Sequence, residues 1–408
     1  MMQSYNIPEL KNKLSSADQM IVLFGAGDIG ELANYSLNKL GLNVSFFCDN
    51  DKDKQGTKWC GIEVLSFDQL IKLKKDTNIF ISNNYFSSIN ANLKNYGFTN
   101  FYDCVELLDQ TNFLNHKFKS LHPLKIERRI EYYKKMCLKD EYVSSGTLAI
   151  KNLDVQVTER CSLKCTNCSN LMQYYERPVN ENLEQLFLTL DRFMECIDKI
   201  YEFRVLGGDP FMNKELHRIV DKLVGYKKTE KVIVYTNGKI IPKGPNLNCL
   251  KNKKVILDMT NYGPISNKHE EIVKVCKENN ISYSETLVTV WQDCGEVLPL
   301  QTRSEQEKKR KFIDCCNSDQ LSLLKGKLYR CPFSANAENL NAIPINKKDQ
   351  VDLNDLKISK EDLKIQIKNL VYNKDYITAC SFCNGRDYSV KKIKAAEQTK
   401  KPLEYIRV

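Results

Sequence analysis

The stretch Cys161-Ser162-Leu163-Lys164-Cys165-Thr166-Asn167-Cys168 decides how the rest of the chain is organised. It follows Leu153–Val157, an alternating apolar run that predicts a strand. Three cysteines at these spacings on one loop suit an iron–sulfur cluster held by three thiolates. One iron of a [4Fe–4S] cluster would then lack a protein ligand and stay open for chemistry. Structural zinc is the alternative, although zinc usually takes four ligands in paired CxxC spacing.

Length and composition indicate a globular protein of more than one domain. The chain has 408 residues, so we expect two or three domains. Hydrophobic residues make up 42% and charged residues 27% of the chain, which is ordinary for such proteins. No apolar run approaches membrane-spanning length, and Met1–Leu14 lacks the apolar region of a signal peptide. We therefore expect a cytoplasmic location.

Cysteine usage and charge narrow the function classes. Sixteen cysteines in a reducing compartment favour metal ligation where they cluster. The net charge of +10 is spread along the chain, without a basic groove interleaved with aromatic residues. We expect no nucleic-acid partner, whereas a basic surface favours an anionic substrate such as one bearing phosphates.

Residues 1–110 alternate between predicted strands and helices, which is typical of a Rossmann-like parallel sheet. Gly25, Gly27 and Gly30 form a GxGxxG motif after the strand Gln19–Phe24, and Asp49 ends the next strand. The glycines would let a phosphate approach the backbone, and Asp49 could accept hydrogen bonds from a ribose. A domain that has lost its ligand is the alternative interpretation.

This part of the chain resembles small nucleotide- or nucleotide-sugar-binding domains attached to saccharide-modifying enzymes. The resemblance rests on Cys48–Asp51 and Gly61–Val64. It implies a nucleotide sugar, or recognition of a carrier-linked substrate, at least as readily as NAD. Residues 111–150 are predicted to be a helical connector, with a helix over Leu124–Leu138 and a turn at Ser144–Gly146.

Residues 151–310 again alternate strand and helix, which predicts a partial (β/α)6 TIM-like barrel. The expected strands after the first are Tyr201–Leu206, Lys231–Tyr235, Lys254–Met259 and Ile281–Thr286, and the helices between them are Asn182–Lys199, Lys214–Val224 and His269–Asn279. Active residues of such barrels lie where strands end. The first four strands here end in the cysteine loop, Gly207–Pro210, Thr236–Gly238 and Asp258–Gly263.

These motifs resemble those of the radical S-adenosylmethionine (SAM) enzymes. The resemblance implies that Cys161, Cys165 and Cys168 hold a [4Fe–4S] cluster whose open iron is chelated by SAM. It also implies that reduction of the cluster cleaves SAM to a 5′-deoxyadenosyl radical, which removes a hydrogen atom from substrate. An electron donor such as flavodoxin or ferredoxin follows from that chemistry.

The same resemblance assigns the SAM contacts. Gly207, Gly208, Asp209 and Pro210 match a "GGEP" segment that binds the amino group of SAM, with Asp in place of Glu. Thr236 and Asn237 match positions that contact the SAM ribose or carboxylate. Asn167 departs from the aromatic residue that commonly precedes the third cysteine.

A second cysteine set lies in residues 311–390. Cys315 and Cys316 precede a predicted hairpin over Leu321–Arg330, which leads to Cys331. Cys380 and Cys383 form a CxxC motif. One of Cys315 and Cys316 with the other three gives four thiolates, which suits a second [4Fe–4S] cluster or zinc.

The second cysteine pattern resembles the shortened Twitch form of the SPASM auxiliary-cluster domain of radical SAM enzymes. Twitch-bearing relatives include enzymes that oxidise or epimerise sugar-like alcohols. We therefore expect an α/β enzyme of carbohydrate biosynthesis, an oxidoreductase or epimerase acting on a saccharide or nucleotide-linked saccharide. Cys294 is a candidate hydrogen donor, and Asp258, Asp293 and Arg303 are candidates for substrate contact or proton transfer.

Two other functions stay open. A peptide-modifying radical SAM maturase would need a leader-peptide recognition domain, which residues 1–110 do not resemble. A zinc-stabilised nucleotide-binding protein would use the cysteines only for structure. Residues 391–408 are predicted to be a basic tail.

Overall fold

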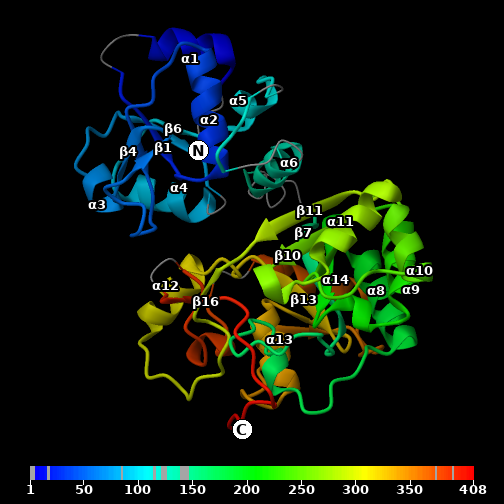
Figure 1. Cartoon of the computed structure of the whole chain (residues 1–408). Helices are drawn as coiled ribbons and strands as arrows, with labels where there is room; N and C mark the ends of the chain where they lie inside the picture. Colours follow the sequence, from blue (N-terminus) through cyan, green and yellow to red (C-terminus); the bar gives the residue numbers. More distant parts are fainter. Residues whose placement is uncertain are drawn as a thin grey trace. The chain divides into compact units, whose positions relative to one another are not determined.

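The computed structural model describes residues 5–15, 19–83, 86–113, 116–120, 126–137, 147–372, 375–387 and 390–408. The chain divides into two compact units, Met1–Ser145 and Gly146–Val408, each with its own hydrophobic core (Figure 1). The predicted turn at Ser144–Gly146 lies outside the described residues.

Unit 1 contains a six-stranded sheet in the order β3-β4-β2-β1-β5-β6. All its neighbouring strands pair in parallel except β3 and β4. The strands are β1 (Ile21–Phe24), β2 (Phe46–Cys48), β3 (Lys58–Trp59), β4 (Ile62–Leu65), β5 (Asn78–Ile81) and β6 (Phe101–Tyr102). The helices are α1 (Ile7–Leu14), α2 (Asp28–Lys39), α3 (Phe67–Leu70), α4 (Phe86–Asn95), α5 (Val105–Asp109) and α6 (Ile126–Cys137).

The predicted alternation of strand and helix in this unit is confirmed. The β3–β4 hairpin was not predicted, because two strands of two and four residues carry little periodic signal. Its second strand, β4, adds to the parallel sheet beside β2.

Unit 2 is built on an eight-stranded sheet in the order β11-β10-β9-β8-β7-β13-β14-β15. Strands β7 to β11 and β13 pair in parallel, whereas β14 and β15 are antiparallel additions. The parallel strands are β7 (Ala149–Thr158), β8 (Lys199–Gly207), β9 (Thr229–Thr236), β10 (Val255–Asn261), β11 (Tyr283–Leu287) and β13 (Leu321–Leu324). The predicted strands are therefore all present, with boundaries shifted by a few residues.

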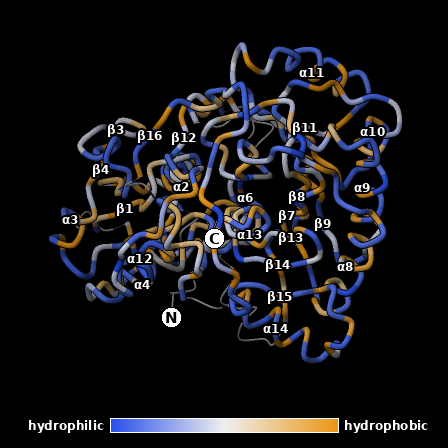
Figure 2. The backbone as a smooth tube through the Cα atoms, turned by 90° about the horizontal axis from the view of Figure 1, so that it is seen from below, coloured by the Kyte–Doolittle hydropathy of each residue, from blue (hydrophilic) through white to orange (hydrophobic). Residues whose placement is uncertain are grey.

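Helices cover one face of this sheet (Figure 1). Leu153, Val155 and Val157 on β7 pack there against α8, α9, α11 and α14 in the main hydrophobic core. Figure 2 shows hydrophobic residues along the central strands. The helices of the unit are α8 (Leu183–Cys196), α9 (Leu216–Gly225), α10 (Gly244–Asn248), α11 (His269–Glu278), α12 (Glu305–Asp314), α13 (Pro332–Asn339) and α14 (Lys360–Tyr372).

The predicted hairpin after Cys316 is present as β13 and β14 (Lys327–Tyr329), and β15 (Gln350–Asp352) extends it. The predicted basic tail differs from the structure. It contains β16 (Lys392–Lys394), which pairs antiparallel with β12 (Val290–Gln292). Residues that follow β16 bond to the three-cysteine loop, so this segment is part of the fold.

Candidate functional site

The three-cysteine loop begins directly after β7. Cys165 is buried, and Cys161 and Cys168 are half-buried. All three pack in one small apolar cluster with side chains from distant segments. Tyr262 and Trp291 belong to that cluster and meet edge to face, with ring centroids 5.5 Å apart. The structure therefore brings the three thiols together beneath an aromatic cover.

Each sulfur has hydrogen-bond donors nearby. Cys161 Sγ accepts from Leu163 N and from Asn237 Nδ2, both at 3.5 Å. Cys165 Sγ accepts from Gln398 Nε2 at 3.0 Å. Backbone amides just after Cys168 bond to its sulfur. Donors of this kind favour the thiolate form, which is the form that ligates iron.

Burial is the largest cause that raises the pKa of these thiols. Burial first and the neighbouring Cys168 next raise the pKa of Cys165 to about 12. The pKa of Cys161 also lies well above its ordinary value, with burial first and Asp209 next among the causes. Three crowded thiols that resist losing their protons form a donor set that a cationic group would stabilise. The residues present thus fit an iron–sulfur cluster.

The two glycines after β8 allow a close backbone approach to this loop. Gly207 has φ +137°, and a Cβ there would lie 2.2 Å from Thr158 O. A Cβ on Gly208 would lie 2.0 Å from Arg160 O. Gly208 N donates to Thr158 O at 2.8 Å, so the end of β8 is joined to the start of the cysteine loop.

Asp209 joins the ends of β8 and β9. Its carboxylate accepts from Thr236 Oγ1 at 2.8 Å and from Asn237 N at 3.2 Å, and its other oxygen accepts from Phe211 N at 3.0 Å. The side chain is 1% exposed, and burial raises its pKa. Both oxygens are thus engaged inside the protein, and the carboxylate acts as a positioning group for the next strand end.

Asn237 faces the cysteine loop. Its Nδ2 donates to Ser162 Oγ at 3.1 Å as well as to Cys161 Sγ, and its Oδ1 accepts from Lys239 N at 3.1 Å. Thr236 is 4% exposed and bonds to Asp209. The predicted residues Asp209, Thr236 and Asn237 therefore lie together, with Asn237 in contact with the Cys161 thiol.

A polar face of the large sheet lies opposite the helix-covered one. Asp154 on β7 alternates with the core residues and pairs with Arg204 of β8, Nε to Oδ1, at 3.3 Å. The Arg204 guanidinium carbon is 5.0 Å from the centre of the Tyr235 ring. Asp258 stands in register between Tyr235 of β9 and Ser284 of β11. The strands thus place an acid–base–aromatic row on one face.

Of the residues in this row, Asp258 was identified from the sequence, whereas Asp154, Arg204 and Tyr235 were missed. The alternation Leu153-Asp154-Val155-Gln156-Val157 held the signal, because a polar residue at every second position of a buried strand marks a second, polar face. Asp154 is 1% exposed, and burial is the largest influence on its pKa, which it raises.

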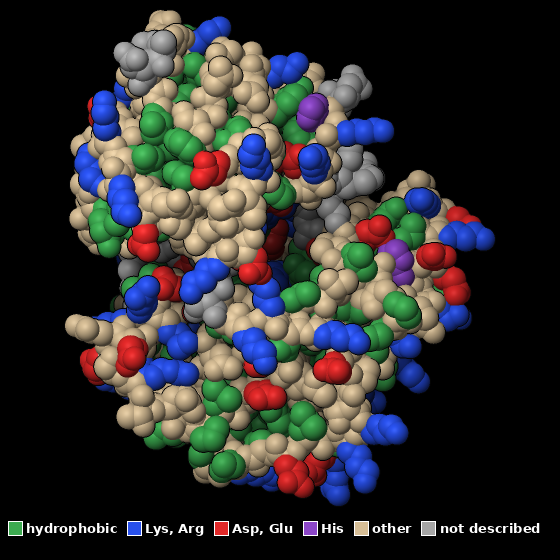
Figure 3. Space-filling view, turned by 60° about the vertical axis from the view of Figure 1, so that its left-hand side comes forward, with side chains coloured by type: hydrophobic (Ala, Val, Ile, Leu, Met, Phe, Trp, Pro, Cys, Tyr) green, Lys and Arg blue, Asp and Glu red, His purple; other side chains and the backbone are tan. Residues whose placement is uncertain are grey.

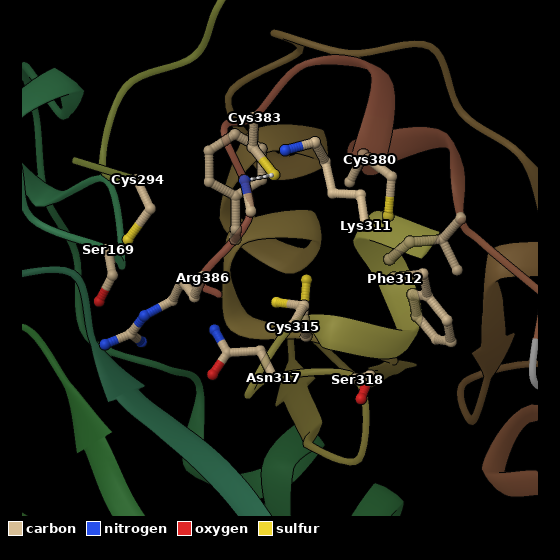
Figure 4. A pocket seen from close by; sticks show the side chains of 15 residues that line it. Ser169, Cys294, Lys311, Phe312, Cys315, Asn317, Ser318, Cys380, Cys383 and Arg386 are labelled. Atoms are coloured by element: carbon tan, nitrogen blue, oxygen red, sulfur yellow. Dashed lines mark hydrogen bonds between the residues drawn. The ribbon is translucent and has the colours of Figure 1, made fainter. Parts of the chain in front are cut away.

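The second cysteine set lines one pocket of unit 2 (Figure 4). The side chains of Cys315, Cys380 and Cys383 point into the same cavity, and Cys294 lies at its edge beside Ser169. Cys331 also lines the pocket, whereas Cys316 is exposed and bonds to Asn317. The geometry therefore favours Cys315 over Cys316 as the fourth thiol.

Two basic side chains on or before α12 hold the CxxC loop. Arg303 Nη1 donates to Cys380 O at 2.7 Å and to Cys383 O at 3.1 Å. Lys311 Nζ donates to Asn384 O. Arg303, predicted to contact substrate, is thus placed against the second cysteine set. Asp293 joins the same region through its backbone, since its N donates to Lys391 O and its O accepts from Asn384.

The glycine motif of unit 1 is tightly packed. A Cβ on Gly25 would lie 2.5 Å from Ser82 O, and one on Gly30 would lie 2.0 Å from Gly25 O, while Gly27 has open space. Asp49 is 2% exposed. Its oxygens accept from Ala26 N, Asp51 N and Lys54 Nζ at 2.9, 2.9 and 3.1 Å. The predicted ribose acceptor is therefore engaged within the unit.

No group of three or more His, Cys, Asp and Glu side chains in the described residues is placed to hold a single metal ion. Likewise, none of the helices in the described ranges is long and apolar enough to cross a membrane. On the face drawn in Figure 3, Lys and Arg side chains are interspersed with Asp and Glu, in line with the spread of charge along the sequence.

Fold and cysteine loop together define an α/β protein with a thiol-rich site where parallel strands end. In sequence, the chain is similar to the GTP 3',8-cyclase of Helicobacter pylori (strain ATCC 700392 / 26695), 25% identical over 51% of this chain and 69% of the relative. It is also similar to that of strain HPAG1, 26% identical over 34% of this chain and 41% of the relative. A third relative, the GTP 3',8-cyclase of Campylobacter jejuni (strain RM1221), is 34% identical over 22% of this chain and 28% of the relative. The chain thus spans less than half the length of two of these three relatives.

The similarity to these GTP 3',8-cyclases agrees with the resemblance of the cysteine loop to that of the radical SAM enzyme family. That family implies a [4Fe–4S] cluster and SAM as cofactors. Separately, the family described as C2185-like, N-terminal, matches residues 17–100.

Solved structures overlap the chain more loosely. A structure of BtrN with AdoMet and 2-DOIA covers 63% of this chain and 98% of its own, at 14% identity and a TM-score of 0.37. A structure of native anSMEcpe with bound AdoMet covers 52% of this chain and 79% of its own, at 13% identity and a TM-score of 0.38.

Proposed function

We propose that this chain is a radical SAM enzyme whose radical-generating cluster is held by Cys161, Cys165 and Cys168. The observation that carries the proposal is the convergence of these three thiols with Asn237 and Gly207–Gly208 at neighbouring strand ends. When bound, the cluster supplies the electron that cleaves SAM. The sheet of β7 to β11 with β13 corresponds in this proposal to a partial (β/α)6 barrel.

The chain's own residues prepare the SAM site. Gly207 and Gly208 keep the end of β8 against the cysteine loop, where Gly208 N and Asp209 N donate to the carbonyls of Thr158 and Arg160. Asp209 fixes Thr236 and the Asn237 backbone. Asn237 supports Cys161, and the radical SAM resemblance makes it a side chain that would contact the ribose or carboxylate of SAM.

We assign the second pocket to an auxiliary [4Fe–4S] cluster held by Cys315, Cys331, Cys380 and Cys383, in a Twitch-like domain. When bound there, such a cluster would supply an acceptor for an electron from a substrate radical. Four thiols around one cavity, with Arg303 and Lys311 holding their loop, support this assignment. Zinc, the alternative that the cysteine pattern also suits, is less well supported, because no group of side chains in the described residues is placed to hold a single metal ion.

We infer that the substrate is a saccharide or nucleotide-linked saccharide, and that the outcome is oxidation or epimerisation. The polar sheet face supports this, because carboxylate, guanidinium and aromatic groups in one row suit a hydroxyl-rich ligand. Asp258 and Arg204 are the contacts that we favour, and Cys294 can return a hydrogen atom. A peptide substrate is less well supported, since unit 1 is a parallel α/β unit and not a small peptide-recognition fold.

Unit 1 is proposed to bind a nucleotide sugar or the carrier of the substrate. The engaged Asp49 argues against a ribose at that carboxylate, so the open space at Gly27 is the better candidate for a phosphate. A cytoplasmic location and reduction by flavodoxin or ferredoxin complete the proposal.

Anaerobic purification and reconstitution test it. We expect a brown protein that forms 5′-deoxyadenosine from SAM with dithionite, fastest with its nucleotide-sugar substrate. The triple variant Cys161→Ala, Cys165→Ala, Cys168→Ala should form none, whereas Cys60→Ala, which removes a thiol outside both sites, should behave as wild type. A colourless protein containing only zinc, or a triple variant that still cleaves SAM, would refute the proposal.

A further inference from the structure

The segment after β16 runs antiparallel to the three-cysteine loop. Thr166 N donates to Glu397 O at 2.7 Å, and Thr399 N donates to Lys164 O at 2.8 Å. Cys165 and Gln398 stand opposite each other in this pairing. Two segments more than 200 residues apart in sequence are thus joined at the middle cysteine.

The segment is itself fixed at its other end. β16 pairs with β12, where Trp291 stands opposite Ile393. Ala395 N donates to Thr289 O at 2.9 Å, and Ala396 is fully buried in the apolar cluster around the cysteines. Gln398 therefore leaves a well-anchored backbone.

The orientation of the Gln398 amide is determined by its partners. Oε1 accepts from Lys164 N at 2.8 Å, and Nε2 donates to Ala396 O at 2.7 Å. The remaining N–H of Nε2 points to Cys165 Sγ at 3.0 Å. A flipped amide would set oxygen against the Ala396 carbonyl and nitrogen against the Lys164 amide, so this orientation satisfies every group.

Cys165 depends on this contact more than its neighbours do. Cys161 has two donors, and Cys168 has backbone amides from its own loop. Among the described residues, Gln398 is the only donor to Cys165 Sγ. Although Gln398 is exposed overall, it contacts a cysteine that is only 7% exposed.

We propose that Gln398 is a positioning residue of the three-cysteine loop, whose amide donates to the Cys165 thiolate and raises the reduction potential of the cluster held there. The inference rests on the proposed function. Hydrogen bonds to cluster sulfurs are among the determinants of reduction potential, because they stabilise the more negative, reduced state. Loss of this bond should therefore make the cluster harder to reduce.

The test is an EPR-monitored redox titration of the full-length, cluster-loaded enzyme. The first cluster is recognised as the signal that changes when SAM is added. Gln398→Met keeps the side-chain length without the donor, and Gln398→Asn withdraws the amide from the sulfur. Thr399→Ala is the matched control, since it keeps the backbone bond to Lys164 and removes a hydroxyl that bonds to Lys401 O.

We expect both Gln398 variants to keep their iron. Their reduced-to-oxidised ratio should fall roughly tenfold at a fixed solution potential, equivalent to about 59 mV for one electron. Thr399→Ala should titrate as wild type does. If only Gln398→Met loses iron, the reduction potential of Gln398→Asn tests the proposal alone.

Wild-type potentials in both Gln398 variants would overturn the inference, as would loss of the first cluster from both. Either result is distinguishable from failure of the proposed function. If the proposed function were wrong, the wild-type enzyme itself would show no EPR signal that responds to SAM.

Discussion

Asp209 illustrates how a single residue can matter without touching a ligand. Its buried carboxylate accepts three hydrogen bonds, from Phe211 N, Thr236 Oγ1 and Asn237 N. Asp209→Ala leaves these donors unpaired, so we expect a loss of about 2–3 kcal/mol in the free energy of unfolding. SAM binding should weaken as well, because Asn237 loses its support.

The comparison for that substitution is Thr236→Val, which removes one donor and keeps the carboxylate with its two backbone partners. We expect it to cost about 1 kcal/mol. Chemical denaturation and SAM titration measure both variants. Equal effects of the two substitutions would show that Asp209 does not hold the strand ends together.

Glu181 predicts a pH dependence at the residue scale. Burial is the largest cause that raises the pKa of its carboxyl to about 7, while Lys325 lowers it. Between about pH 4.5 and pH 7 the folded state then holds more protons than the unfolded state, so stability decreases as pH rises through this window. The change is at most about 3 kcal/mol.

Thermal denaturation at about pH 5 and pH 8 checks this dependence. The wild-type midpoint should fall more between the two values than that of Glu181→Gln, which cannot titrate. Glu184→Gln, on the exposed start of α8, should follow wild type. An identical fall in all three proteins would assign the pH dependence to other groups.

At the element scale, one side chain joins the loop before α12 to the CxxC segment. Arg303 donates from one nitrogen to two carbonyls, those of Cys380 and Cys383. We expect Arg303→Lys to lose iron from the second site while 5′-deoxyadenosine formation persists, because the guanidinium plane fixes the directions of the two N–H groups of Nη1, which a freely rotating ammonium lacks. Arg310→Lys, on the exposed face of α12, is the control.

Iron content and the EPR signal that does not respond to SAM report this loss. Full retention of that signal in Arg303→Lys would mean that the four thiols hold their cluster without the arginine.

The elements were largely predictable because their signals are local. Apolar runs such as Leu153–Val157 and the turn at Lys325-Gly326 mark strands and a hairpin within a few residues. Pairings between distant segments were not predictable. Nothing in Lys392–Thr399 indicates that it covers Cys165, because the contact depends on the whole chain path between them. For the same reason, sequence could not distinguish Cys315 from Cys316. They are adjacent in the chain, and the fold alone places the side chain of Cys315 in the pocket and leaves Cys316 exposed.

At the scale of the whole molecule, the two units have separate cores, and the thiol sites both belong to Gly146–Val408. Ser169, next to Cys168, lines the pocket of the second cysteine set, so the two sites are neighbours within that unit. Radical generation should therefore need unit 2 alone, whereas recognition of a nucleotide-linked substrate should need unit 1.

A chain that begins at Gly146 tests this division. We expect it to fold, to bind iron at both sites and to cleave SAM without substrate at close to the wild-type rate, because its hydrophobic core is complete without unit 1. Its turnover of a nucleotide-linked substrate should fall at least tenfold, mainly through a higher KM, since the lost contacts bind the part of the substrate that does not react. Equal KM values for the truncated and full-length enzymes would exclude unit 1 from substrate recognition, and substrate-independent SAM cleavage that disappears with unit 1 would show that the radical site depends on it.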